Sequence, residues 1–81
     1  MNKNVLKEWI ETGREIEFTC KGNDYSITYY NDNRKDYISF CKAYDETLDV
    51  SDVDTLWNST YKGMKFSDLW ASVRYDDITL Y

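Results

Sequence analysis

Residues 15–42 switch the hydrophobic period of this chain from helical to strand-like, and this change constrains the fold more than any other feature. In "EIEFTCK", Ile16, Phe18 and Cys20 share one face and alternate with polar residues. The turn signal "GND" then precedes "YSITYY", and "NDNRK" precedes "DYISFCKAY", so the alternation resumes twice after a short polar loop. Three consecutive strands joined in this way predict an antiparallel meander.

Helical periodicity flanks this meander on both sides. "NVLKEWIETGR" predicts an amphipathic helix that Asn2 or Asn4 could cap and that Gly13 is placed to end. After the meander, Ser51 and Asp54 approximate a capping box at the start of a brief helix, with Asp52 also favourable there. "FSDLWASVR" gives the cleanest helical pattern, with apolar residues at i, i+3, i+4 and i+7.

The order of these elements indicates the fold class. With a short C-terminal strand in "DDITLY", the order is α-β-β-β-α-α-β. We therefore expect residues 1–81 to form a single α+β domain. Its single antiparallel sheet has the three-stranded meander and the short C-terminal strand, and two to three short helices pack on one face. The outer face of such a sheet can stay in water, and that face or an exposed edge of the first or third strand could pair in a homodimer.

Aromatic residues supply the bulk that so short a chain needs for a core. The 81 residues include three Trp, eight Tyr and three Phe, and no Pro. Each aromatic ring can bury on the order of 150–250 Å². Strand alternation places Tyr25 and Tyr29 on the inner face and Tyr30 and Tyr37 on the outer face. Outer tyrosines can simply stabilise cross-strand pairs, or Tyr30, Tyr37 and Tyr44 could form a binding surface.

Charge is distributed unevenly along the chain. The formal charge is −5, and residues 45–81 account for all of it with three basic and eight acidic side chains. The stretch "DETLDVSDVD" carries five carboxylates and no cation, and we expect it to be an irregular connection in water. This balance does not favour nucleic acid as a partner, because affinity for phosphates comes mainly from Lys and Arg. It is compatible with a basic protein partner or with solubility alone.

The residues that usually carry chemistry are absent or badly spaced. The chain has no His, which removes the commonest general base and the nucleophile–histidine pairs. Two cysteines, Cys20 and Cys41, fall short of a four-ligand zinc site. The acidic stretch lacks the glycine and the final Glu of a calcium-binding EF-hand loop. We therefore expect no enzymatic activity, no catalytic residues, no metal and no cofactor.

The N-terminus "MNKNVLKEWI" lacks the apolar run of a signal peptide, and no stretch approaches the ~18 residues needed to span a bilayer. These patterns predict a cytoplasmic protein with no membrane contact. In that compartment Cys20 and Cys41 are expected to be free thiols.

The runs "GREIEFTCKGNDYSITYY" and "YISFCKAYDETLDVSDVDTLW" together resemble small single-domain proteins of low-GC Gram-positive bacteria. The resemblance covers most of the chain and implies an α+β domain that opens with a short helix and a hairpin. No activity is known for that family, so the resemblance implies no functional residues.

Three functions fit these observations. The first is a small, acidic, non-enzymatic protein-interaction module whose partner has a basic or mixed surface. Its candidate binding residues are Asp45, Glu46, Asp49, Asp52, Asp54, Tyr30, Tyr37 and Tyr44. The second is an inhibitor from a mobile element that imitates nucleic acid with its carboxylates, Asp76 and Asp77 included. The third is a binder of single-stranded nucleic acid that uses Tyr30, Tyr37, Arg34 and Lys35.

Overall fold

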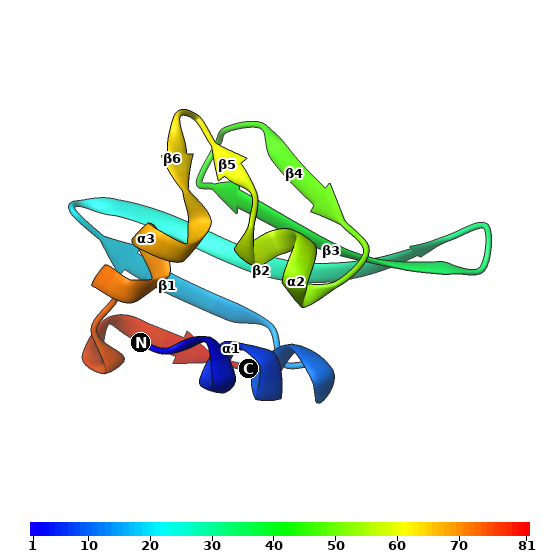
Figure 1. Ribbon diagram of the computed structural model, residues 1–81, viewed down its shortest axis with the longest axis horizontal. Coiled ribbons are helices and arrows are strands. Elements are labelled where there is room, and N and C mark those ends of the chain that lie inside the picture. Colours follow the sequence, from blue (N-terminus) through cyan, green and yellow to red (C-terminus); the bar gives the residue numbers. More distant parts are fainter.

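The alternating residues 15–42 form the centre of an antiparallel sheet (Figure 1). The structure, a computed structural model, describes all 81 residues, Met1–Tyr81. The three central strands are β1 (Ile16–Cys20), β2 (Asn23–Asp32) and β3 (Lys35–Lys42). Each pairs with the next in an antiparallel register, so the predicted meander is confirmed.

Two further strands make this a five-stranded sheet. Strand β4 (Thr47–Val50) pairs with β3, and β7 (Ile78–Leu80) pairs with β1, giving the order β4-β3-β2-β1-β7. The prediction of an irregular acidic connection was therefore wrong over 47–50, because Leu48 and Val50 turn inward while Asp49 turns outward. Residues 47–50 alternate as an ordinary strand does, but the many carboxylates around them led to the prediction of an irregular segment. The edges of the sheet are consequently β4 and β7. The prediction that the first or third strand has an exposed edge was wrong, because β1 and β3 each have a neighbouring strand on both sides.

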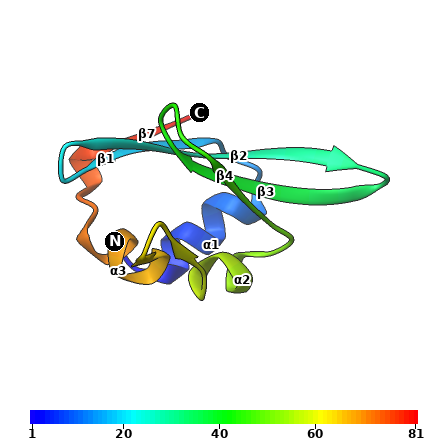
Figure 2. The same ribbon diagram turned by 90° about the horizontal axis from the view of Figure 1, so that it is seen from above.

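One face of the sheet is covered and the other is open. Figure 2 shows α1 (Lys3–Glu11), α2 (Val53–Trp57) and α3 (Phe66–Ser72) on the same side of the sheet. A small hairpin of β5 (Thr60–Tyr61) and β6 (Met64–Lys65) lies between α2 and α3. One 3-10 turn, Tyr75–Asp77, leads into β7. The fold is α+β with one antiparallel main sheet and helices on one face, as predicted.

Local signals define the ends of the helices. The Asn2 side chain accepts a hydrogen bond from the Val5 backbone N–H at 3.0 Å, and Gly13 follows α1 with φ +72°. At α2 the cap is Asp52, which accepts from the Thr55 N–H at 2.7 Å, so the predicted box that starts at Ser51 is displaced by one residue. An Asp carboxylate at this position satisfies a free N–H of the first turn.

The core lies between the sheet and the helices and is rich in aromatic rings. Trp70 is fully buried, and its indole N–H donates to the Asn2 carbonyl at 2.9 Å. Its ring meets Phe18 edge-on at 5.4 Å and stacks with Phe66 at 6.2 Å. Trp9 and Trp57 are half-buried at the border of this core. Burying such rings is the main source of stability in a domain of this size.

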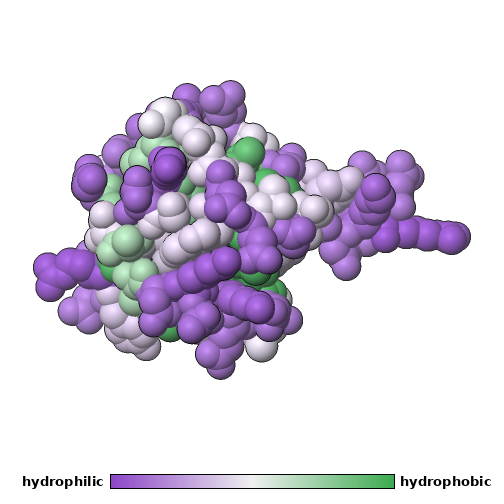
Figure 3. Space-filling view, in the orientation of Figure 1, coloured by the Kyte–Doolittle hydropathy of each residue, from purple (hydrophilic) through white to green (hydrophobic).

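The hairpin of β2 and β3 extends beyond its neighbours. Pairing of β2 with β1 stops at Ile27, and pairing of β3 with β4 stops at Ile38. Residues 28–37, which we call the projecting hairpin, therefore have no strand on either side (Figure 1). Its turn residues Asn33 and Arg34 both have positive φ, 51° and 66°, as a two-residue type I′ turn requires. In the space-filling view of Figure 3 the tip of the projecting hairpin is hydrophilic.

Candidate functional site

The outer face of the projecting hairpin carries a pair of stacked tyrosines. Tyr30 lies directly opposite Tyr37, and their ring centroids are 5.1 Å apart with the planes inclined by 18°. The Tyr30 hydroxyl donates to Asp49 Oδ2 at 3.1 Å, which joins the pair to β4. Desolvation, and then the hydrogen bond and charge of Asp49, raise the pKa of Tyr30. Three predicted binding residues are thus brought together on the open face of the sheet.

A groove lies at the base of the projecting hairpin and has a volume of about 480 Å³. Its apolar side chains come from three parts of the chain, namely Ile10 of α1, Tyr29 and Ile38 of the sheet, and Val53 of α2. Its polar lining includes three carboxylates, Glu11, Asp36 and Asp52. Tyr30 and Tyr37, whose stacked rings lie on the open face of the sheet, also contribute to its lining. A concave apolar surface with a few polar groups is the usual form of a binding site.

Tyr29 fixes the base of the projecting hairpin to the body of the molecule. Its hydroxyl donates to the Arg14 carbonyl at 2.6 Å, in the connection between α1 and β1. Burial, and to a lesser degree the charge of Glu15, raises the pKa of Tyr29 to about 12. Tyr25, four residues before Tyr29 in β2, is buried in the core. The predicted division of the tyrosines between the two faces of the sheet is confirmed.

The carboxylates of the acidic stretch do not form a free patch. Lys62 lies 3.0 Å from Asp45 and 3.5 Å from Glu46, and both contacts join the β3–β4 turn to the β5–β6 hairpin. A hydrogen bond from the Glu46 N–H, and then Lys62, lowers the pKa of Asp45. The interpretation of the whole stretch as one contact surface therefore needs revision.

The other two carboxylates of the set lie near the start of α2. Asp54 forms an ion pair with Lys3 of α1 at 2.8 Å. Asp52 caps the helix, and the hydrogen bond from the Thr55 N–H lowers the pKa of Asp52. Asp52 is the only one of the five acidic candidates that lines the groove, whereas Asp49 contacts Tyr30 on the opposite side of the sheet.

Tyr44 stands apart from the other candidate residues. It is fully exposed and has φ +62° in the turn that the Asp45 N–H closes on the Lys42 carbonyl at 3.0 Å. This left-handed conformation favours glycine at the third position of the turn. Tyr44 lies seven positions after Tyr37 along a largely extended chain, a span of roughly 20 Å. The structure therefore does not place Tyr44 in the same site as the stacked pair.

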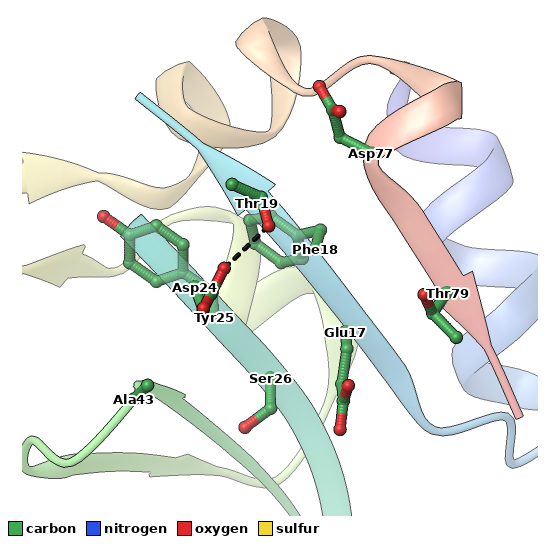
Figure 4. Close-up of a pocket in the computed structure, with 9 residues that line it drawn as sticks. All are labelled: Glu17, Phe18, Thr19, Asp24, Tyr25, Ser26, Ala43, Asp77 and Thr79. Atoms are coloured by element: carbon green, nitrogen blue, oxygen red, sulfur yellow. Dashed lines mark hydrogen bonds between the residues drawn. The ribbon is translucent and has the colours of Figure 1, made fainter. Parts of the chain in front are cut away.

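A smaller depression lies on the open face of the sheet, at the other end of β1 and β2 (Figure 4). It has a volume of about 310 Å³, and its polar lining includes Glu17, Asp24 and Asp77. The Thr19 hydroxyl donates to Asp24 at 2.7 Å, and the Tyr81 hydroxyl donates to Glu17 at 3.1 Å. The structure brings together no group of His, Cys, Asp or Glu residues that could hold a metal ion. We favour the groove because it is larger and its lining is more apolar.

Both cysteines are free thiols, as predicted. Cys20 is buried in the core, whereas Cys41 lies half-buried on the open face with its sulfur 3.5 Å from the Ser26 hydroxyl. Neither lines the groove.

Of the predicted binding residues, Asp52, Tyr30 and Tyr37 line the groove, whereas Ile10, Glu11 and Asp36 were not predicted as site residues. No local pattern marks Ile10 or Glu11, since both belong to α1. The run 23–32, twice as long as the strand 16–20 that pairs with it, indicates only that the far end of the hairpin projects.

Comparison with known proteins identified no relatives: no family model, no curated protein and no solved structure matches this chain. The resemblance to small proteins of low-GC Gram-positive bacteria stays a prediction. No helix in the structure has both the length and the apolar character needed to cross a bilayer.

Proposed function

We propose that this chain is a small, non-enzymatic protein-interaction module that binds a partner at the groove and along the projecting hairpin. The observation that carries this proposal is the unpaired state of residues 28–37. Both outer backbone edges of the projecting hairpin lack a neighbouring strand, and its tip is fully exposed. Unpaired strand edges are ready positions for another chain to add main-chain hydrogen bonds.

The composition of the site supports a protein partner. Interfaces combine an apolar, aromatic centre with a polar rim, and Tyr is enriched at their centres. Here Ile10, Tyr29 and Val53 supply apolar surface, and Glu11 and Asp36 supply charge around it. The contact surface first expected at 45–54 therefore moves to the groove, which Ser51, Asp52 and Val53 of that stretch line and where Asp52 is its only carboxylate.

The two alternative functions have weaker support. A nucleic-acid mimic needs free carboxylates, yet Asp45 and Glu46 pair with Lys62, and Asp54 pairs with Lys3. A single-strand binder needs open ring faces beside cations. Tyr30 and Tyr37 cover one face of each other, and Asp32 lies opposite Lys35 in the same hairpin.

Affinity capture from the native cell with matched baits tests the proposal. The Ser51→Trp variant places an indole in the groove from an exposed position, and Thr79→Trp does the same in the depression on the open face. We expect the unmodified chain and the Thr79→Trp variant to retain the same protein, and the Ser51→Trp variant to lose it.

The identified protein is then produced alone, and its binding to each bait is measured by calorimetry. Equal binding by the Ser51→Trp variant would contradict the proposal. Recovery of nucleic acid alone, or loss of the partner only with Thr79→Trp, would contradict it as well.

A further inference from the structure

The carboxylates that line the groove lack cationic partners within the chain. Asp36 accepts only a neutral hydrogen bond, from the Asn31 side chain at 2.8 Å, and Asp52 accepts from a backbone N–H. Neither forms an ion pair. Glu11 has one distant contact, with Lys7 at 3.9 Å, and both side chains are more than half exposed. Such a contact contributes little.

No lysine or arginine lines the groove to balance these charges. Arg14 follows Gly13 in the sequence, but its guanidinium donates to the Tyr81 carbonyl. Arg34 and Lys35 belong to the tip, and Lys35 shares the outer face of the sheet with Tyr37. Three carboxylates around a partly apolar hollow concentrate negative potential there, because apolar walls screen charge less than water does. Asp52 is the only carboxylate of the acidic stretch that contributes to this potential, and Lys62 and Lys3 pair with Asp45, Glu46 and Asp54 of that stretch.

The apolar part of the groove suits an aliphatic chain. Ile10 of α1 is half-buried, and Val53 of α2 and Ile38 of β3, which also line the hollow, are 9% and 5% exposed. Lys and Arg side chains bury their methylene stems on apolar surface while the charged group stays at a polar rim. An adjacent Leu, Ile or Val would occupy the remaining apolar space.

We infer that the groove accepts a short partner segment in which a Lys or Arg adjoins an aliphatic residue, with the cation between Asp36 and Asp52 and the aliphatic side chain against Ile10 and Val53. This inference rests on the proposed function and specifies the chemistry of the partner. The cation of the partner segment supplies the ion-pair partner that Asp36 and Asp52 lack within the chain. Bidentate hydrogen bonds favour Arg over Lys at such a position.

Three peptides that differ only in charge test this inference. The basic peptide is Gly-Leu-Arg-Leu-Lys-Leu-Gly, and in the two controls Gln or Glu replaces both cations. Each is titrated into the ¹⁵N-labelled chain. We expect the basic peptide to shift the amide resonances of residues 10–13, 29–38 and 51–53, and the Gln and Glu peptides to bind far more weakly.

Two triple variants, each of which removes three negative charges, test whether the charges that bind the basic peptide are those of the groove. Glu11→Gln, Asp36→Asn and Asp52→Asn remove the groove charges but keep one acceptor oxygen at each position, and Asn caps a helix as well as Asp does. Glu8→Gln, Asp68→Asn and Asp76→Asn remove three charges from exposed positions outside the groove. The first triple variant should weaken binding of the basic peptide about tenfold. The second should leave it nearly unchanged, and thermal melting checks that both variants are folded.

Several results would overturn the inference. They are equal binding of the Gln peptide, equal weakening by both triple variants, and resonance shifts confined to residues outside the groove. Absence of any binding by the basic peptide would also overturn it. None of these would affect the proposed function if the natural partner still binds the unmodified chain and fails to bind the Ser51→Trp variant. Conversely, a partner indifferent to Ser51→Trp would remove the proposed function itself.

Discussion

Two parts of the same strand differ sharply in what surrounds them. Phe40 of β3 is completely buried and meets Tyr61 and Phe66 edge-on, each at 5.0 Å. Tyr37, three residues earlier, faces the opposite side and stacks only with Tyr30. The Phe40 ring belongs to the part of the domain outside residues 28–37, which the helices cover and which we call the body. The Tyr37 ring belongs to the projecting hairpin.

This difference separates the part of the chain that stabilises the fold from the part that remains available to a partner. Stability in a small domain comes mainly from apolar area removed from water, and nearly all of that area lies in the body. Segments with few buried contacts open locally at low free energy. We therefore expect substitutions in the body to unfold the chain and substitutions in the projecting hairpin to alter binding. The following predictions test that division, from the largest effect to the smallest.

The largest effect is expected for Trp70→Ala. The substitution removes a fully buried ring that contacts Phe18 and Phe66, and it deletes the hydrogen bond to the Asn2 carbonyl. Loss of such a side chain typically lowers the free energy of unfolding by about 3–5 kcal/mol. Urea denaturation followed by circular dichroism measures this value. Trp70→Phe, which keeps part of the ring area, should lose less, and equal losses would place the effect in the hydrogen bond.

At the junction of the two parts, Tyr29 should make stability depend on alkaline pH. Its pKa is raised to about 12 in the folded chain, against an ordinary value of 10.0. The folded state therefore holds a proton that the unfolded state releases, and this contribution is complete below about pH 10 and lost as pH rises toward 12.

Urea denaturation between pH 9 and 11.5 gives the slope of stability against pH. The Tyr29→Phe variant should show a shallower decline than the unmodified chain. Parallel curves for the two proteins would show that the Tyr29 hydroxyl is solvated.

A smaller loss is expected for Tyr37→Ala. Tyr37 is half-buried, and its ring stacks with Tyr30 but touches no part of the core cluster. A cross-strand aromatic pair of this kind contributes about 0.5–1 kcal/mol. The same denaturation experiment measures the change. A loss near that of Trp70→Ala would mean that the projecting hairpin is part of the core.

A change of similar size to that of Tyr37→Ala, but of opposite sign, is expected for Arg34→Gly. Arg34 has φ +66° at the second position of the hairpin turn, where glycine is strongly preferred. Removing this strain should raise the free energy of unfolding by about 0.5–1 kcal/mol. A decrease would indicate that the Arg34 side chain makes a stabilising contact. Asn33→Gly, at the first turn position, serves as the matched variant.

Sequence patterns predicted the body well because each of its elements carries a local signal. Alternation located β1, β2 and β3, and Asn2 and Gly13 marked the ends of α1. Strand β4 was missed because Asp49 and its acidic neighbours outweighed the alternation of Leu48 and Val50. The cap of α2 was misplaced by one residue because Ser51 and Asp52 are both good caps.

The candidate site was less predictable for a different reason. Its lining comes from α1, both strands of the projecting hairpin and the start of α2, which lie far apart in the sequence. The cations that pair with Asp45 and Asp54 are likewise distant, at Lys62 and Lys3. The composition of the acidic stretch therefore overstated how many free carboxylates it presents, and it gave no indication of the groove. The excess length of β2 over β1 accounts for the projection of the hairpin but does not locate the groove.

The most direct measurement is the free energy of unfolding of a shortened chain in which Asn-Gly replaces residues 31–36. Tyr30 then lies opposite Tyr37 across a two-residue turn, on the same type of rung that Asp32 and Lys35 form now. If the projecting hairpin serves a partner and not the fold, the free energy of unfolding should stay within about 1 kcal/mol of the full-length value. A loss of roughly 3 kcal/mol or more, comparable with Trp70→Ala, would contradict the division.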